Sequence, residues 1–422
     1  MDNSNNIIER IQHLSVAIDQ ALQAGERETA LTLLETGRHE MSGSIRAQRE
    51  LDDLIRRMLF AHLDAARRAT DPAAEARWLA TATDILGPQE HWLSQLRQYL
   101  MGDRARLVVV LTWQCETRCT YCTIPKQDGR EMDGPTLDSA IELLMSSGRE
   151  KLELRFFGGE PMMAWEQIQY GIEAAQSACQ GRDIQFMITT NGYALTPERV
   201  AWLGQHPVQL QIALDGLPEA HNVHRKSIIP GELSYDHSAI DKASVLQEHG
   251  VAHEVILVVH PARINEFVDD FEHIVDQGFE RIQINWAHNV IWHEKHLHAF
   301  ADGLHKLGDL LRKRWANDES IWLINLGETL LKIRTFREIT VDHDGQIYAN
   351  NAFLYRPSSA SDLCLGHLDD GHNWWRYRLD GADGEELKQL SFAAPVAENN
   401  ARVGSVFSSW IRWMQSQGLP DF

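Results

Sequence analysis

The chain has little positive charge, and it contains no long apolar run. Among its 422 residues 60 are acidic and 40 are lysine or arginine, which gives a formal charge of −20. A protein whose main partner is a nucleic-acid backbone needs clustered lysine and arginine to neutralise phosphates. No apolar stretch approaches the length of a membrane span, and no secretory signal opens the sequence. We therefore expect a cytoplasmic protein that has neither nucleic acid nor a membrane as its partner.

Cysteine is also scarce, and the chain has only five. Three of them, Cys115, Cys119 and Cys122, fall within eight residues with the spacing C-x3-C-x2-C. So few cysteines, so closely grouped, favour a reducing compartment over a disulfide framework. The loop follows an apolar run, Leu107 to Leu111, that predicts a buried strand. Thiolates hold iron–sulfur clusters, so the spacing predicts a cluster with three protein ligands and one iron open to another molecule.

A structural zinc site is the alternative interpretation of these cysteines. Structural zinc usually takes four closed protein ligands, most often cysteine and histidine. No further pair of cysteines or histidines stands at a finger-like distance from this loop. The sequence therefore favours the iron–sulfur cluster.

Residues 1–102 are predicted to form an all-helical domain. Apolar residues recur at spacings of three and four, and strong helix formers dominate. The predicted helices cover residues 5–24, 26–40, 45–69, 72–86 and 89–100. Two interpretations stay open for this domain: a cap that packs on a catalytic domain, and a docking module for a partner peptide.

Residues 103–318 alternate between short β-rich runs and helical runs. The predicted strands cover residues 107–112, 151–156, 184–190, 208–214, 251–259 and 281–286. The predicted helices cover residues 134–147, 164–179, 196–204, 235–250, 265–278 and 293–317. Regular alternation of this kind predicts right-handed crossovers and a parallel sheet that curls toward a barrel. In such folds the chemistry sits at the carboxyl ends of the strands.

Three further motifs follow predicted strands. After the second strand comes Phe157-Gly158-Gly159-Glu160-Pro161, in which the glycines allow close approach and the carboxylate can hold an ammonium group. The third strand ends in Thr189-Thr190-Asn191-Gly192, and the fourth in Leu214-Asp215-Gly216, followed by Arg225. Each motif alone is ordinary turn chemistry. Together with the cysteine loop they resemble the radical S-adenosylmethionine (SAM) enzymes.

The resemblance implies an α/β fold, a partial (β/α)6 barrel, with one [4Fe-4S] cluster held by Cys115, Cys119 and Cys122. SAM would chelate the open iron through its amino and carboxylate groups. An electron from the cluster, supplied by a flavodoxin- or ferredoxin-like donor, would cleave SAM to a 5′-deoxyadenosyl radical that abstracts hydrogen.

The resemblance also carries over individual cofactor-binding residues. Tyr121 would lie near the adenine, and the segment Gly158, Gly159 and Glu160 would receive the amino group of SAM. The residues implied to line the ribose and carboxylate are Asn191, Asp215 and Arg225. One departure is Ala213, where the family often has serine.

Residues 319–422 are predicted to form a smaller α+β extension. Asp344-Gly345 lies between two alternating runs, which predicts a hairpin. The segment resembles the start of the SPASM extension of radical SAM peptide maturases. However, Asn350 stands where that resemblance expects a cluster cysteine, and no cysteine follows Gly366. We therefore expect no auxiliary cluster.

Two cysteines and a group of histidines are left. Cys179 falls inside a predicted helix and is expected to be a small buried residue. Cys364 is either buried in the same way or, as in some peptide epimerases of the superfamily, a hydrogen donor to a substrate radical. A run of histidines, His288, His293, His296 and His298, suggests metal ligation, but a solvated or substrate-facing helix is favoured because histidine pairs need further ligands.

The leading functional hypothesis is a radical SAM enzyme that modifies a ribosomally made precursor peptide by crosslinking, epimerisation or a related hydrogen abstraction. One alternative is a radical SAM enzyme that acts on a small molecule or nucleotide. Another is a catalytically inert adaptor that binds a peptide through its helical domain.

Overall fold

The structure is a computed structural model, and its two parts are described separately. It describes residues 2–24, 26–41, 51, 55–56, 58–60, 62–63, 72–86, 104–124, 126, 129–288, 290–327, 338–348, 364–371 and 394–417. The chain divides into two compact units, Met1–Asp103 and Arg104–Phe422. The predicted division into three domains, with a boundary at residue 318, stays a prediction.

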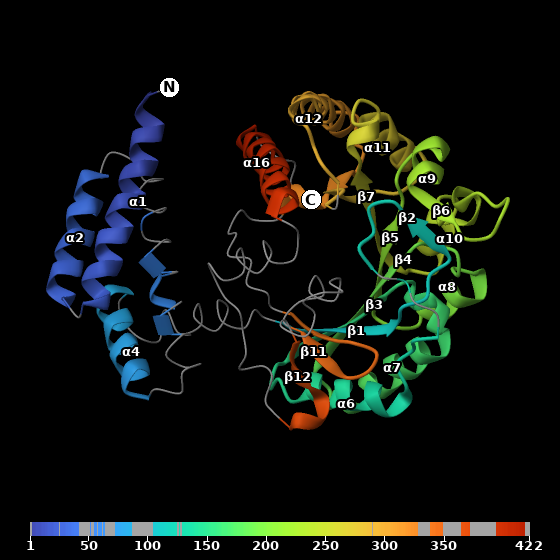
Figure 1. Cartoon of the computed structure of the whole chain (residues 1–422), viewed down its shortest axis with the longest axis horizontal. Coiled ribbons are helices and arrows are strands. Elements are labelled where there is room, and N and C mark those ends of the chain that lie inside the picture. The colour runs from blue at the N-terminus through green and yellow to red at the C-terminus, as the bar shows by residue number, and fades with distance from the viewer. Residues whose placement is uncertain are drawn as a thin grey trace. The chain divides into compact units, whose positions relative to one another are not determined.

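The N-terminal unit is helical throughout its described residues (Figure 1). Its helices are α1 (Asp2–Gln23), α2 (Arg27–Glu40) and α4 (Pro72–Leu86). Helices α1 and α2 approach closely at Gly37, where a Cβ atom would lie 2.0 Å from Leu14 Cδ2. These helices match the predicted ones over 5–24, 26–40 and 72–86. The predicted helix over 45–69 is described only at scattered positions, and the one over 89–100 lies outside the described residues.

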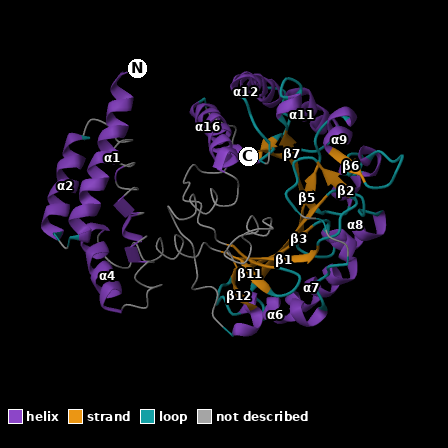
Figure 2. Cartoon of the chain, in the orientation of Figure 1, coloured by secondary structure: helices purple, strands orange, loops and turns teal. Residues whose placement is uncertain are grey.

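The C-terminal unit is built on a ten-stranded sheet in the order β12-β11-β10-β1-β3-β4-β5-β7-β8-β9. Six consecutive members are parallel: β1 (Arg104–Thr112), β3 (Lys151–Gly158), β4 (Asp183–Thr190), β5 (Val208–Ala213), β7 (Ala252–Val259) and β8 (Arg281–Trp286). These are the six predicted strands, so the partial (β/α)6 barrel is confirmed. The sheet is curved and open, and helices line its outer side (Figure 2).

The helices that follow the strands match the predicted ones with two exceptions, of which the first is an unpredicted helix over 218–224. They are α6 (Gly134–Met145), α7 (Trp165–Ala178), α8 (Pro197–Leu203), α9 (Pro218–His224), α10 (Ala243–Glu248), α11 (Phe267–Asp276) and α12 (Glu294–Trp315). The predicted helix over 235–250 is wrong in its first half. There the chain forms a single 3-10 turn, η2 (Ser234–His237), and becomes extended at Ser238. The next residue, Ala239, lies against Gly192, where a Cβ atom would come 2.6 Å from its backbone nitrogen, so contact with the loop after β4 interrupts the helix.

The sheet continues beyond the barrel strands at both edges. On one side β9 (Trp322–Leu323) pairs with β8. On the other, β10 (Glu338–Val341) pairs in parallel with β1, and β10 forms the predicted hairpin with β11 (Gln346–Tyr348). Strand β12 (Cys364–His367) completes this edge, whereas Asn350 lies outside the described residues.

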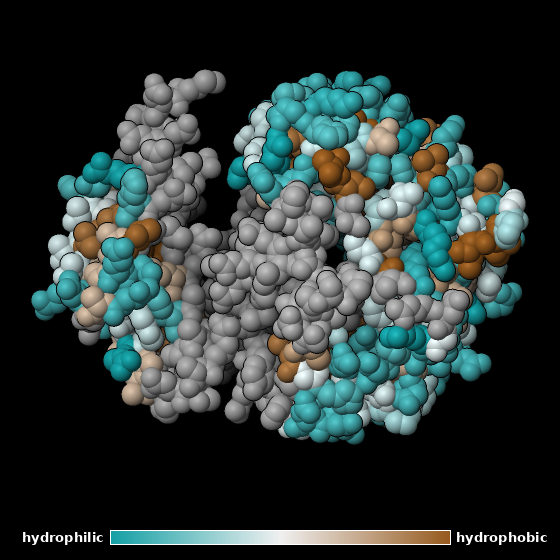
Figure 3. Space-filling model, viewed as in Figure 1, coloured by the Kyte–Doolittle hydropathy of each residue, from teal (hydrophilic) through white to brown (hydrophobic). Residues whose placement is uncertain are grey.

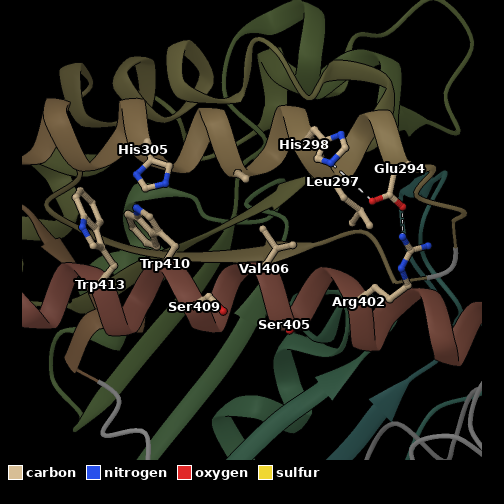
Figure 4. Close-up of a pocket in the computed structure, with 11 residues that line it drawn as sticks. Glu294, Leu297, His298, His305, Arg402, Ser405, Val406, Ser409, Trp410 and Trp413 are labelled. Carbon is tan, nitrogen blue, oxygen red and sulfur yellow. Dashed lines mark hydrogen bonds and ion pairs between the residues drawn. The ribbon is translucent and has the colours of Figure 1, made fainter. Parts of the chain in front are cut away.

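The last described helix, α16 (Ala394–Ser416), packs along α12. A groove of about 650 Å³ runs between the two helices, with Trp410, Trp413 and His305 toward one end and the ion pair of Glu294 and Arg402 at the other (Figure 4). None of the predicted cluster or cofactor-binding residues lines this groove, whereas His298 of the histidine run does. Among the described residues, no helix has both the length and the hydropathy needed to cross a membrane.

The side chain of Asn399 fastens α16 to the segment that leads into α12. Its Oδ1 accepts from the backbone N–H of Trp292 (2.7 Å), and its Nδ2 donates to the Trp292 carbonyl (2.6 Å). Both residues are buried.

Replacing Asn399 with alanine would leave two buried backbone groups without partners. We expect Asn399→Ala to lower the free energy of unfolding by roughly 2–4 kcal/mol, measured by urea denaturation. The exposed Asn317→Ala variant, whose side chain caps nothing buried, should stay within about 0.5 kcal/mol of the wild type. Equal stabilities for the two variants would contradict this account.

Candidate functional site

The cysteine loop begins directly after β1 and is held by a short ribbon. Strand β2 (Thr117–Cys119) pairs antiparallel with β6 (Arg225–Ser227), with Cys119 opposite Arg225. The hydroxyl of Thr117 lies between two of the thiols, 3.3 Å from Cys115 Sγ and 3.6 Å from Cys119 Sγ. The backbone N–H of Cys122 donates to the Cys119 carbonyl (3.1 Å), so one tight turn carries two of the thiols while Cys115 precedes β2, and none of the three is in a disulfide.

Hydrogen-bond donors lie beside two of these sulfur atoms, those of Cys115 and Cys119. Lys126 Nζ lies 3.3 Å from Cys115 Sγ and donates to the Thr117 carbonyl at 2.6 Å. Arg225 Nη1 lies 3.8 Å from Cys119 Sγ, and Asn191 Nδ2 lies 3.9 Å from Cys115 Sγ. Nearby cations and N–H groups stabilise thiolates, which are the form of cysteine that binds metals. The donor set therefore fits a thiolate-bound cluster.

The two glycines after β3 bring that strand end against the cysteine loop. Gly158 has φ of +140°, and a Cβ atom there would lie 2.2 Å from the Thr112 carbonyl oxygen. A Cβ atom at Gly159 would lie 2.1 Å from the Gln114 carbonyl oxygen. The N–H groups of Gly159 and Glu160 donate to the same two carbonyls, at 2.8 and 2.7 Å. The close approach here is between two backbone segments, and cofactor contact by these glycines stays a prediction.

Glu160 is buried, and three donors fix its carboxylate. It accepts from Thr190 Oγ1 (2.8 Å), from the backbone N–H of Asn191 (2.7 Å) and from that of Met162 (3.1 Å). The carboxylate thus joins the end of β3 to the end of β4, as expected for motifs at the carboxyl ends of neighbouring parallel strands. Burial raises the pKa of Glu160 to about 7, and the negative charge of Glu116 acts in the same direction.

The predicted residues Tyr121, Asp215 and Arg225 form one network beside Cys119. Two nitrogens of the Arg225 guanidinium lie 3.1 and 3.0 Å from the two oxygens of Asp215. The Tyr121 hydroxyl donates to Asp215 at 2.5 Å, and the Val258 N–H at 3.3 Å. Asp215 and Arg225 are buried, and the negative charge of Asp215 keeps the pKa of Arg225 above its ordinary value despite burial. Asp215 therefore orients Arg225 and Tyr121, because its oxygens are occupied by these protein donors.

Sequence reasoning missed several neighbours of the site. Glu116 and Lys126 carry no motif signal, because they are ordinary charged residues within the loop. His260 could have been identified from the sequence, because it directly follows β7 at the sheet edge where the other motifs lie. Its ring lies 4.0 Å from that of His224, whose Nδ1 is 3.1 Å from Thr120 Oγ1. Burial lowers the pKa of His260 to about 4, so this imidazole is neutral at neutral pH.

Cys364 is partly buried on β12. Its thiol donates to the Gly366 carbonyl (3.3 Å), and it packs against a cluster that includes Val110 and Trp113. Trp113 stands two residues before Cys115, so Cys364 belongs to the sheet region beside the cysteine loop. Cys179 is buried at the end of α7, as predicted.

The four histidines of the 288–298 run do not come together as a ligand set. His293 precedes the first turn of α12, where its backbone N–H donates to His296 Nδ1 (3.1 Å). His298 is exposed and lies 3.7 Å from Glu294. In the described part of the chain, the residues whose ligand atoms lie close enough together to share a single metal ion are instead Asp342, His343 and Asp344. Asp342 already accepts from Trp113 Nε1 (2.8 Å).

Comparison with known proteins identifies the segment that contains these motifs. Residues 109–278 match the model of the Radical SAM superfamily. This segment is a radical SAM domain. The curated relatives include the radical SAM cyclopropyl synthase TigE of Paramaledivibacter caminithermalis, 22% identical over 156 residues, which are 33% of each chain. An uncharacterized protein of Methanocaldococcus jannaschii is 24% identical over 111 residues, 26% of this chain and 38% of that protein. The matched regions thus span only about a third of the relatives' length.

Solved structures share the fold. The structure of anSMEcpe with bound AdoMet superposes with a TM-score of 0.59 at 15% identity, covering 74% of this chain and 99% of that chain. The structure of anSMEcpe with bound AdoMet and Cp18Cys peptide gives 0.57 at 16% identity, with the same coverage. The fold class is therefore confirmed, and the match of residues 109–278 to the superfamily model confirms the predicted family resemblance.

The buried carboxylate of Glu160 gives a pH-dependent stability. Because its pKa is about 7 in the folded protein and 4.5 as its ordinary value, the folded state holds more protons between these pH values. Stability of the iron-free protein should therefore fall as pH rises through this window. We expect the free energy of unfolding of Glu160→Gln, relative to wild type, to increase by roughly 3 kcal/mol between pH 4.5 and pH 8.

Denaturation of both proteins at several pH values measures this difference, and the exposed Glu131→Gln variant controls for the loss of one charge. A difference between Glu160→Gln and wild type that stays constant with pH would show that Glu160 does not titrate in this window.

Proposed function

We propose that this radical SAM enzyme binds one [4Fe-4S] cluster through Cys115, Cys119 and Cys122, and that it modifies a peptide by hydrogen abstraction. The observation that carries the proposal is the cysteine loop itself: three thiols within eight residues, two of them beside N–H donors, in a loop that is hydrogen-bonded to the end of β3 beside Glu160. When bound, the cluster and SAM supply a reductively generated radical that abstracts hydrogen.

The chain's own residues would bind and orient that cofactor. Glu160 presents a carboxylate that three protein donors hold in place, which suits the amino group of SAM. Asn191, in contact with Glu160 and close to Cys115, fixes the spacing between carboxylate and cluster. Asp215 holds the Arg225 guanidinium toward Cys119 and the Tyr121 ring beside it, where the ring can pack on adenine. Gly158 and Gly159 permit the strand end to come this close.

A peptide substrate is supported by the surface next to the cysteine loop. Four of the eight exposed large hydrophobic side chains found in the described residues fall between residues 223 and 233: Val223, Ile228, Ile229 and Leu233. This segment includes β6, the strand that pairs with the cysteine loop, and Figure 3 shows hydrophobic surface at this edge of the unit. An apolar surface beside the site suits a peptide chain better than a nucleotide. The structure of anSMEcpe with bound AdoMet and a peptide points the same way.

The proposal also covers the number of clusters, the electron donor and the binding of the precursor peptide. With three cysteines in the loop, a single cluster is proposed, and its electron would come from a flavodoxin- or ferredoxin-like protein. A reducing, cytoplasmic setting suits such a site. We also propose that the N-terminal helices hold the leader part of a precursor peptide.

Epimerisation is the candidate reaction that a specific observation favours. Cys364 lies on β12, which pairs with β11 at the edge of the sheet, and it packs near Trp113. After hydrogen abstraction from a peptide Cα, the Cys364 thiol would return a hydrogen atom to that carbon and become a thiyl radical. A reductant for that radical, such as the proposed electron donor, restores the thiol with one electron and one proton.

The proposed cluster predicts the effect of removing one ligand. Anaerobically reconstituted wild type should bind iron and form 5′-deoxyadenosine from SAM and dithionite. Cys119→Ala should fold normally but bind no iron, because two thiolates cannot hold a cubane. Its yield of 5′-deoxyadenosine should fall by at least about 100-fold. The matched control is Cys179→Ala, a buried cysteine outside the loop, which should keep both. Product formation by Cys119→Ala, or its absence from iron-loaded wild type, would contradict the enzyme assignment, and the latter would favour an adaptor.

The hydrogen-donor role predicts a separate phenotype for Cys364→Ala. SAM cleavage should be intact, whereas incorporation of solvent deuterium into a co-expressed candidate peptide, read by mass spectrometry in D2O, should be lost. Gln346→Ala, at the exposed start of β11, is the control. Unchanged deuterium incorporation in Cys364→Ala would exclude Cys364 as the donor, and a product lighter by two hydrogens would indicate a crosslink instead.

A further inference from the structure

Glu116, which belongs to none of the motifs, lies within the cysteine loop. It directly follows Cys115, and its carbonyl accepts from the Ile228 N–H at 2.9 Å, so the β2 and β6 ribbon fixes its backbone. Its side chain is half-buried, and Oε2 accepts from Asn191 Nδ2 at 3.2 Å. The carboxylate is therefore placed and oriented by the same residue that contacts Glu160.

Asn191 links the two carboxylates. Its backbone N–H donates to Glu160 Oε2 and its side-chain amide donates to Glu116 Oε2, so both carboxylates sit on one residue. They are close enough for the charge of Glu116 to act on Glu160. The donors to these oxygens in the described part of the chain are neutral: Thr190, Asn191 and Met162.

Two carboxylates brought together with neutral donors repel each other, and partial burial increases the cost. A cation between them would remove this cost. Lys126 and Arg225 are instead directed at the thiols of Cys115 and Cys119. The guanidinium of Arg118, also in the loop, donates to the carbonyls of Cys115 and Thr117. The arrangement therefore leaves a place for a positive charge that comes from a ligand.

We propose that Glu116 is a second carboxylate for the α-ammonium group of SAM, acting together with Glu160. This inference rests on the proposed function. This α-amino group is an ammonium with three N–H donors in free SAM and an amine with two when it binds iron, so in either form it can serve two carboxylates at once, whereas the sulfonium of SAM has no N–H to donate. Glu116 lies next to Cys115 in the chain, so the amino end of the cofactor would be held on the cluster side of the site.

The test compares binding of three ligands by reconstituted full-length protein. SAM carries the ammonium and the sulfonium, S-adenosylhomocysteine only the ammonium, and 5′-methylthioadenosine neither. Glu116→Gln keeps an oxygen that can accept from Asn191 and removes only the charge. Equilibrium dialysis should show SAM and S-adenosylhomocysteine binding about tenfold more weakly to this variant, as expected when a charge-assisted bond becomes a neutral one. Binding of 5′-methylthioadenosine should be unchanged.

Two further variants control for charge and folding. Glu131→Gln removes a charge from an exposed residue that reaches Gln114 in the same loop (3.5 Å), and it should bind all three ligands like wild type. Glu116→Asp keeps the charge and should retain most of the affinity. Iron content is measured for every variant, and affinities are compared at equal iron content, because SAM and S-adenosylhomocysteine can reach the open iron through their amino and carboxylate groups whereas 5′-methylthioadenosine has neither group.

The outcomes separate this inference from the proposed function. If iron-loaded wild type binds none of the three ligands, the proposed function fails and the inference falls with it. If wild type binds SAM and Glu116→Gln binds it equally well, only the inference is overturned. A loss for SAM without a loss for S-adenosylhomocysteine would also overturn it, because the charge would then serve the sulfonium.

Discussion

The contact between the cysteine loop and the end of β3 is the constraint on which the site depends. Two backbone hydrogen bonds, from Gly159 to Thr112 and from Glu160 to Gln114, hold the segments together. Side chains at residues 158 and 159 would block this approach, since a Cβ atom at either would come within about 2 Å of a carbonyl oxygen. The two glycines thus place the thiols and the buried carboxylate on one side of a shared backbone junction.

A second set of contacts carries the site from β1 and β3 across to β5 and β7. Asp215 follows β5, accepts from the Val258 N–H of β7 and holds Arg225 at the start of β6. Because β6 pairs with β2, the position of Arg225 and that of Cys119 are coupled. The parallel strands therefore supply a rigid frame, and each loop at their carboxyl ends contributes one charged or polar group.

Charge is arranged by sign within this small region. Cationic groups, Lys126 and Arg225, face the sulfur atoms, while the carboxylates of Glu116 and Glu160 lie together beside Asn191. Positive charge next to thiolates and negative charge next to an expected ammonium group are both favourable. Because of this separation, the motif residues together match the charges of a thiolate-bound cluster and of the amino group of SAM, which no single motif residue does.

The barrel and the motif positions could be predicted because they rest on local signals. Apolar strands alternate with amphipathic helices, and the cysteines, Glu160 and Asn191 each follow a strand, which brings them to one edge of a parallel sheet. What could not be predicted depends on contacts between segments distant in sequence. The break at Ser238 comes from packing on Gly192, and the use of Asp215 to orient Arg225 appears only when their side chains meet. Glu116 is likewise one acidic residue among 60 until Asn191 is placed beside it.

The central claim is that three thiolates hold one cluster and leave a single iron for SAM. Mössbauer spectroscopy of protein reconstituted with iron-57 tests it most directly. The account predicts about four irons per chain in one cluster, with about a quarter of the signal shifting when SAM is added. A spectrum of four equivalent irons that does not change when SAM is added would contradict the claim, as would a site that takes up zinc and no iron.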